Sequence, residues 1–384
     1  MIDVTNDKRL NEISDKVLSG KRITSTEGLW LLENAPDHAL AVLAHHVKTV
    51  KHPEPYVSYV ISRNINYTNV CITDCDFCSF YRRPLDPEAY SLTLEQMREK
   101  AQETLDLGGT EILLQGGHNP KLPLKYYQDM LGQFRAMGLH NHSFSPSEIQ
   151  NFALFWGMTV PQVLKELIAA GLNSIPGGGA EVLSDRVRNI ICPKKGGAQD
   201  WLMPMREAHK LGIRSSATMM MGHVETVAER IEHIEHLRNL QDETGGFTAF
   251  IVWTFQSFGN RMSNIKMSGA REYLRMLAVS RIYLDNFDNF QSSWVTQGGQ
   301  VGQLSLRYGC NDMGSLMIEE NVVRLAGASF RMNELMIRDL VREAGFTPRR
   351  RNFFYQLQDE PAGLDQKLRA ESIASDPGRV PVSA

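Results

Sequence analysis

The run Cys71-Ile-Thr-Asp-Cys75-Asp-Phe-Cys78 follows soon after a strand-like stretch, Val57–Asn64, and places three thiols in one short loop. The chain has five cysteines in all, so most of its thiols lie here. Thiolates are soft ligands that hold iron–sulfur clusters, and a cubane cluster is normally held by four of them. Three clustered thiolates therefore predict a cluster with one iron left free to bind another molecule.

The cysteine run could also serve zinc binding, electron transfer or disulfide formation. Structural zinc usually takes four ligands, commonly as two Cys-x-x-Cys pairs or a Cys/His mixture, and the sequence has no second pair. An electron-transfer cluster would need a fourth cysteine, for which Cys192 or Cys310 is available. A disulfide framework is disfavoured by the odd cysteine count and the length of the chain.

The rest of the composition is that of an ordinary soluble globular protein. The chain has 384 residues, 22% charged and 42% hydrophobic, with a formal net charge of −3. It has no long basic run, and the triplet Arg349–Arg351 is predicted to be a solvated turn, so nucleic-acid binding is not expected. No apolar stretch is long enough to insert into a membrane, and the first residues lack a signal-peptide pattern, so we expect a cytoplasmic protein.

Short apolar strands alternate with amphipathic helices along the chain, which favours a parallel sheet. At least six such steps predict an α/β fold, a TIM-like barrel whose catalytic residues lie on loops after the strands. The strands are expected near residues 57–64, 111–115, 142–145, 173–175, 215–221, 249–255 and 289–294. We expect an N-terminal helical segment (1–50), the barrel (51–330) and a C-terminal helical extension (331–384) with a frayed tail from Glu371 onward.

Several loops at the predicted strand ends carry candidate site residues. Gln115-Gly116-Gly117 and Gly177-Gly178-Gly179 are either tight turns or places where the backbone approaches a ligand. His142 and His223 are either structural or proton-transferring histidines. Asn311 and Asp312 fit either a turn or contact with substrate hydroxyls, and the second of these is a candidate catalytic residue.

The Cys-x₃-Cys-x₂-Cys spacing, with Phe77 before the last cysteine, resembles the signature of radical S-adenosylmethionine (SAM) enzymes. The resemblance implies a [4Fe-4S] cluster on Cys71, Cys75 and Cys78, with SAM chelating the fourth iron. It implies a one-electron donor such as flavodoxin or ferredoxin. It also implies SAM contacts from Phe77, Gln115, Gly116, Gly117, Glu181 and Ser216, although Glu181 fits a helix start equally well and Ser216 could be packing.

Longer segments, near residues 66–71, 115–120, 142–149 and 171–183, resemble the menaquinone enzymes of the futalosine pathway and their deazaflavin-synthase relatives. Within that group, residues 77–82 and 174–181 favour the cyclase branch, which acts on dehypoxanthine futalosine. The implied reaction removes hydrogen from C4′ of the ribose with a 5′-deoxyadenosyl radical and joins the sugar to its attached benzoate ring. The implied substrate is a small, anionic, nucleoside-like molecule. Aminofutalosine synthase, a deazaflavin-synthase subunit and an electron-transfer protein are the alternatives.

Overall fold

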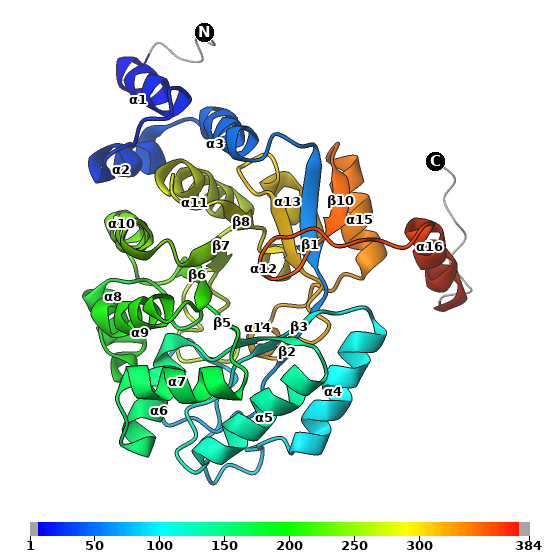
Figure 1. Cartoon of the computed structure of the whole chain (residues 1–384). Coiled ribbons are helices and arrows are strands. Elements are labelled where there is room, and N and C mark those ends of the chain that lie inside the picture. Colours follow the sequence, from blue (N-terminus) through cyan, green and yellow to red (C-terminus); the bar gives the residue numbers. More distant parts are fainter. Residues whose placement is uncertain (1–6, 376–384) are drawn as a thin grey trace.

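Ten parallel strands form one sheet in the order β10-β1-β9-β8-β7-β6-β5-β4-β3-β2 (Figure 1). The computed structural model describes residues 7–375. The strands are β1 (Tyr56–Val60), β2 (Ser62–Ile65), β3 (Glu111–Leu114), β4 (His140–Ser143), β5 (Ser174–Ile175), β6 (Arg214–Met221), β7 (Phe247–Thr254), β8 (Asn289–Gln291), β9 (Asp312–Ser315) and β10 (Thr347–Arg350).

The sheet closes into a barrel because β1 and β2 are two halves of one strand, separated only by Ile61. The first half pairs with β9, where Ser58 lies opposite Asp312, and the second half pairs with β3, where Ser62 lies opposite Glu111. Strand β10 pairs with β1 and adds an extra strand beside this seam. The predicted TIM-like α/β barrel is confirmed.

Helices surround the barrel, and the N-terminal ones pack against α10 and α11 on its outside (Figure 1). The helices are α1 (Lys8–Leu18), α2 (Ser25–Asn34), α3 (Asp37–Lys51), α4 (Leu94–Asp106), α5 (Leu124–Ala136), α6 (Pro146–Trp156), α7 (Val160–Ala170), α8 (Asp185–Ile191), the 3₁₀ turn η1 (Pro193–Lys195), α9 (Ala198–Lys210), α10 (Val227–Thr244), α11 (Ala270–Tyr283), α12 (Trp294–Gln297), α13 (Gly299–Ser305), α14 (Val322–Leu325), α15 (Glu334–Glu343) and α16 (Leu364–Ser375). None of the helices within residues 7–375 is long and apolar enough to cross a membrane.

Local sequence signals explain where several of these helices begin. The predicted capping box at Thr93 is present: its side chain accepts from the Gln96 amide while the Gln96 side chain accepts from the Thr93 amide. The same reciprocal pair, formed by Ser145 and Glu148, starts α6. Pro146 is the first residue of that helix, a position whose N–H has no acceptor within the helix, so proline fits there without losing a hydrogen bond.

Three parts of the C-terminal region differ from the sequence expectations. Asp312 begins strand β9 instead of lying in a turn. The arginine triplet is not a solvated turn, because Arg350 ends strand β10 and Arg351 is 2% exposed. The segment 371–375 belongs to helix α16 instead of fraying, and the expectation for residues 376–384 lies outside the described part of the chain.

Candidate active site

The cysteine loop leaves the barrel beyond β2 and is fixed by backbone hydrogen bonds to four separate segments. The amide of Cys71 donates to the carbonyl of Arg82, 2.9 Å away, and the amide of Ile72 donates to that of His118 at 3.2 Å. Asp76 donates to Ile191 and accepts from Arg261 through its backbone. The loop is therefore a rigid part of the fold, which is what a preorganised ligand set requires.

The three thiols of the loop are free and lie in one neighbourhood. Cys75 is 6% exposed, and Cys71 and Cys78 are half-buried. Burial raises the pKa of the Cys75 thiol, and nearby Cys192 and Cys78 act in the same direction, while a lysine opposes them. Of the two solitary cysteines, only Cys192 lies near the loop. Cys310 is buried instead beside Lys48 and Arg281.

The lysine that opposes the rise in the Cys75 pKa is Lys195, the last residue of η1. Its ammonium group donates to Oε1 of Glu181 at 2.8 Å and lies 5.1 Å from the centroid of the Phe77 ring. Both side chains of the ion pair are largely buried. The structure thus brings Glu181, Phe77 and Cys75 together around a buried cation that sequence reasoning missed, because a lysine in a short Pro-Lys-Lys run has no pattern that separates it from surface lysines.

Gly116 and Gly117 pack tightly against the cysteine loop. A Cβ on Gly116 would lie 2.5 Å from the ring of Tyr67, and a Cβ on Gly117 would lie 2.2 Å from the carbonyl oxygen of Val70. Contacts within the protein therefore require both glycines, whether or not a ligand approaches them. Their effect is to hold the segment after β3 directly against the start of the cysteine loop.

Glu148 fixes the same glycine segment from the other side. Its Oε1 accepts from the hydroxyl of Tyr67 at 2.6 Å and from the amide of Gly116 at 3.0 Å. Its Oε2 accepts from the amide and the hydroxyl of Ser145, both at 2.7 Å. A fully buried carboxylate with four donors joins the cap of α6 to both loops, a network rigid enough to position a cofactor.

An inner cavity of about 300 Å³ lies inside the barrel. Inward-facing residues alternate along its strands, as the twofold period of a strand requires. Those lining the cavity include Ser62, Asn64, Glu111, Leu113, Gln115, His142, Ser216, Thr218, Ile251, Trp253 and Gln291. Of the predicted SAM contacts, Gln115 and Ser216 line this cavity, whereas Phe77 and Glu181 lie toward the cysteines.

The floor of the cavity comes from the segment that follows β10. Arg351 and Phe353 line the cavity together with Tyr355. The guanidinium of Arg351 lies 4.0 Å from the centroid of the Tyr355 ring, and Phe353 stacks on His140 with centroids 4.6 Å apart. The C-terminal extension therefore supplies part of the interior wall and does not simply cover the barrel.

The predicted catalytic residue Asp312 lies beneath this floor and is fully engaged. It makes two hydrogen bonds with Arg351 and accepts from the hydroxyl of Ser58 and the amide of Gly314. Asp312 does not line the cavity, but Arg351 does. The carboxylate acts as the group that orients the arginine.

The two predicted histidines have different surroundings. His223 accepts from the amide of Val224 at Nδ1, which also lies 3.2 Å from Oε2 of Glu225, and it contacts the Met220 carbonyl through Nε2, so both nitrogens are engaged within the protein. His142 lines the cavity, with Nδ1 2.8 Å from the hydroxyl of Ser174 and Nε2 3.5 Å from that of Ser216. Burial lowers the pKa of His142 well below the usual value. The geometry favours His142 over His223 as a substrate contact.

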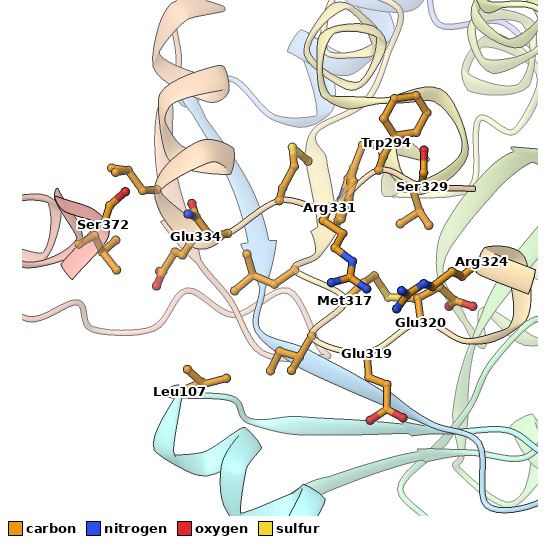
Figure 2. Close-up of a pocket in the computed structure, with 18 of the residues that line it drawn as sticks. Leu107, Trp294, Met317, Glu319, Glu320, Arg324, Ser329, Arg331, Glu334 and Ser372 are labelled. Carbon is orange, nitrogen blue, oxygen red and sulfur yellow. The ribbon is translucent and has the colours of Figure 1, made fainter. Parts of the chain in front are cut away.

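A larger pocket of about 1110 Å³ lies outside the barrel, between the segment 316–335 and α16 (Figure 2). It shares Trp294, Val295, Met317 and Glu320 with the wall of the inner cavity. Figure 2 shows the guanidinium groups of Arg324 and Arg331 directed toward the same part of this outer pocket. Neither group has a hydrogen-bond or ion-pair partner among residues 7–375.

The donor set of the cysteine loop fits an iron–sulfur cluster better than a single metal ion. In the described part of the chain, no three or more His, Cys, Asp or Glu side chains converge closely enough for one ion. A cubane makes a different demand, since each thiolate binds a different iron. A parallel barrel with three free thiols on a fixed loop beyond its first strand is the arrangement of a radical SAM enzyme.

Comparisons with known proteins agree with this class. A model of the radical SAM superfamily matches residues 65–237, and one of the CofH/MqnC C-terminal region matches residues 244–364. A cyclic dehypoxanthine futalosine synthase of Halalkalibacterium halodurans is 44% identical over 91% of this chain and 95% of its own length. The aminodeoxyfutalosine synthase of Thermus thermophilus is 38% identical over 84% of this chain and 88% of its own length. The 5-amino-6-(D-ribitylamino)uracil–L-tyrosine 4-hydroxyphenyl transferase of Methanopyrus kandleri is 37% identical over 93% of this chain and 99% of its own length.

Among solved structures, methylornithine synthase has the same fold, with a TM-score of 0.71 at 17% identity, covering 88% of this chain and 97% of its own. The chain therefore belongs to the radical SAM superfamily, and within it to the family of cyclic dehypoxanthine futalosine synthases and their sister enzymes.

Proposed function

We propose that this protein cyclises dehypoxanthine futalosine, joining C4′ of its ribose to its benzoate ring. The observation that carries the proposal is the 44% identity to a cyclic dehypoxanthine futalosine synthase along 91% of the chain. Sister enzymes reach 40% identity over 79% of this chain and 37% over 93% of it. The inner cavity supports it, because its floor offers an arginine and two aromatic rings suited to a benzoate.

We infer that Cys71, Cys75 and Cys78 hold a [4Fe-4S] cluster and that SAM binds its fourth iron. The cluster, when bound, supplies the electron that cleaves SAM and begins the radical chemistry. Lys195 would balance the negative charge of the thiolates, since it lies beside Cys75 and has Glu181 as its one carboxylate partner among residues 7–375. We infer that Gly116, whose amide donates to Glu148, and the adjacent Gly117 bind the amino end of SAM through their backbone.

The other residues of the site position the substrate and exclude water. Ser216, Gln115 and Asn64 offer polar groups to the sugar hydroxyls, and Arg351 offers the only cation in the described lining of the inner cavity. A cavity closed by Phe353 and Tyr355 below protects a radical from solvent and holds the two reacting centres close together. Half-burial of Cys71 and Cys78 leaves the cluster edge accessible to a flavodoxin- or ferredoxin-like electron donor.

The test is an anaerobic assay of the reconstituted protein with dehypoxanthine futalosine, SAM and dithionite. We expect a product two hydrogen atoms lighter than the substrate, formed together with 5′-deoxyadenosine. The aminodeoxyfutalosine reaction would instead incorporate the adenosyl group into its product. Absence of the lighter product, with turnover of a sister substrate in a parallel reaction, would contradict the proposal.

A further inference from the structure

Glu111 is a buried carboxyl group in the inner cavity, and none of the described residues forms a hydrogen bond with its side chain. It is the first residue of β3, opposite Ser62 of β2 and His140 of β4. Its side chain lines the cavity, and the residue is 6% exposed. Its Oε2 atom is buried and has no hydrogen-bond partner within residues 7–375. A buried carboxyl without a donor is rare, because leaving it unpaired costs about 1–3 kcal/mol or more.

The other ionisable groups that line the cavity are all engaged. Arg351 donates to both oxygens of Asp312 and to the carbonyl of Asn352. The hydroxyl of Tyr355 accepts from Gln291 at 2.6 Å. The remaining carboxyl, Glu320, accepts from the side chain of Asn64 and from the amides of Val322 and Val323.

The charges that face Glu111 come from two groups, Arg351 and Asp312. Burial raises the pKa of Glu111 to about 7, Arg351 from the floor opposes this rise, and Asp312 from β9 adds to it. Tyr355 on the floor and both His140 and His142 on β4 are neutral neighbours, since burial raises the pKa of the tyrosine and lowers those of the histidines. Glu111 is therefore a lining group whose charge changes near neutral pH.

We propose that Glu111 takes the proton that the benzoate ring loses after ring closure. This inference rests on the proposed function. Addition of the sugar carbon leaves one ring carbon tetrahedral and one electron delocalised in the ring. Glu111 accepts the proton of that carbon, and the C–H electron pair returns to the ring. The surplus electron leaves to a one-electron acceptor, an oxidised iron–sulfur cluster. One proton and one electron depart, and the aromatic ring is restored.

The variant Glu111→Gln tests this role because it keeps the shape of the side chain and removes the base. We expect it to form 5′-deoxyadenosine in the presence of substrate while the cyclised product falls about 100-fold or more. In the wild type, product formation should rise with pH through about 7, because the carboxylate form is required. Glu111→Gln should lose this rise, and Glu111→Asp should recover part of the product yield.

Two further measurements separate this role from a structural one. Carbon-13 nuclear magnetic resonance of glutamate-labelled apoprotein should show a carboxyl that titrates near pH 7 and disappears in Glu111→Gln. The matched control is Glu103→Gln on α4, whose side chain is 62% exposed and pairs with Arg63. Its ratio of product to 5′-deoxyadenosine should equal that of the wild type.

An unchanged ratio of product to 5′-deoxyadenosine in Glu111→Gln would overturn the inference and leave the proposed function standing. An equal loss of both, without recovery in Glu111→Asp, would assign Glu111 a structural role instead. A wild-type protein that forms no cyclised product would contradict the proposed function, and the inference would fall with it.

Discussion

Asp312 and Arg351 meet in two parallel hydrogen bonds under the inner cavity, from Nε to Oδ2 at 2.6 Å and from Nη2 to Oδ1 at 2.9 Å. The pair joins the last barrel strand to the segment that follows β10. Both side chains are almost fully buried. Paired in this way, Arg351 is held at one place in the cavity wall, with guanidinium N–H groups left to face a ligand.

Breaking this pair from one side should destabilise the protein. Asp312→Asn leaves the buried guanidinium without its counter-charge, which we expect to lower the free energy of unfolding by about 3–5 kcal/mol. Urea unfolding of the apoprotein measures the loss. The double variant Asp312→Leu with Arg351→Met should recover most of the stability and none of the cyclisation. A single variant as stable as the wild type would contradict this account of the floor.

Cysteine substitutions should separate the three loop cysteines, which bind the cluster, from Cys192 and Cys310, which do not. Cys75→Ala should abolish cluster assembly, measured as iron and sulfide content after anaerobic reconstitution, because two thiolates cannot retain the cubane. Cys310→Ala is the matched control, since Cys310 lies beside Lys48 and Arg281 and away from the loop. Cys192→Ala should also keep the cluster. If Cys192→Ala lost it, Cys192 would be a fourth ligand and the electron-transfer alternative would gain support.

We expect the buried ammonium group of Lys48 to make the free energy of unfolding depend on pH. It is 2% exposed, has no carboxylate partner among residues 7–375, and its ammonium group donates to the carbonyl of Leu306 and lies over the ring of Phe346. Burial lowers the pKa of Lys48 to about 7 from 10.5. The unfolded chain therefore binds the proton more tightly, so stability should rise as pH increases from about 7 to about 10.

Lys48→Met should remove this dependence and raise the free energy of unfolding at pH 7 by on the order of 1–2 kcal/mol. Denaturant titrations at pH 7 and pH 9.5 provide the comparison. Lys51→Met, at a partly exposed position paired with Asp288, is the control and should leave the pH slope unchanged. A destabilised Lys48→Met would mean that the contact with Phe346 outweighs burial of the charge.

Arg324 and Arg331 line the outer pocket without a side-chain partner in the described part of the chain, and they should assist the arrival of an anionic substrate. The double variant Arg324→Gln with Arg331→Gln should raise KM about threefold to tenfold and reduce its dependence on salt, with kcat unchanged. Steady-state kinetics at several salt concentrations measure this effect. Arg135→Gln on α5, outside the pocket, should behave as the wild type. An unaltered KM in the double variant would exclude this route of approach.

Patterns local in sequence predicted most of the barrel. Strands such as β6 and β7 have the right length and composition, and the cap at Thr93 follows from residues three apart. The floor could not be predicted in the same way. Strand β10 contains a proline and two arginines, so its composition matches a turn, and Arg351 is buried only because Asp312 lies 39 positions away in sequence and adjacent in space.

In the site, too, features local in sequence could be predicted, and features that depend on the folded barrel could not. The three cysteines are adjacent in the chain, so their spacing alone indicates a shared ligand. The roles of Lys195 and Glu111 depend instead on which strands and loops the barrel brings together. Glu111 begins an ordinary apolar strand, and nothing in its neighbours indicates that its side chain faces the cavity floor.

The central claim is that three thiolates hold a cubane whose fourth iron binds SAM. Electron paramagnetic resonance of the anaerobically reduced protein, titrated with SAM, tests it most directly. We expect a [4Fe-4S]⁺ signal whose g-values change as SAM binds, with the change complete at one SAM per protein. A signal that SAM leaves untouched, or a protein that holds zinc in place of iron, would contradict the account.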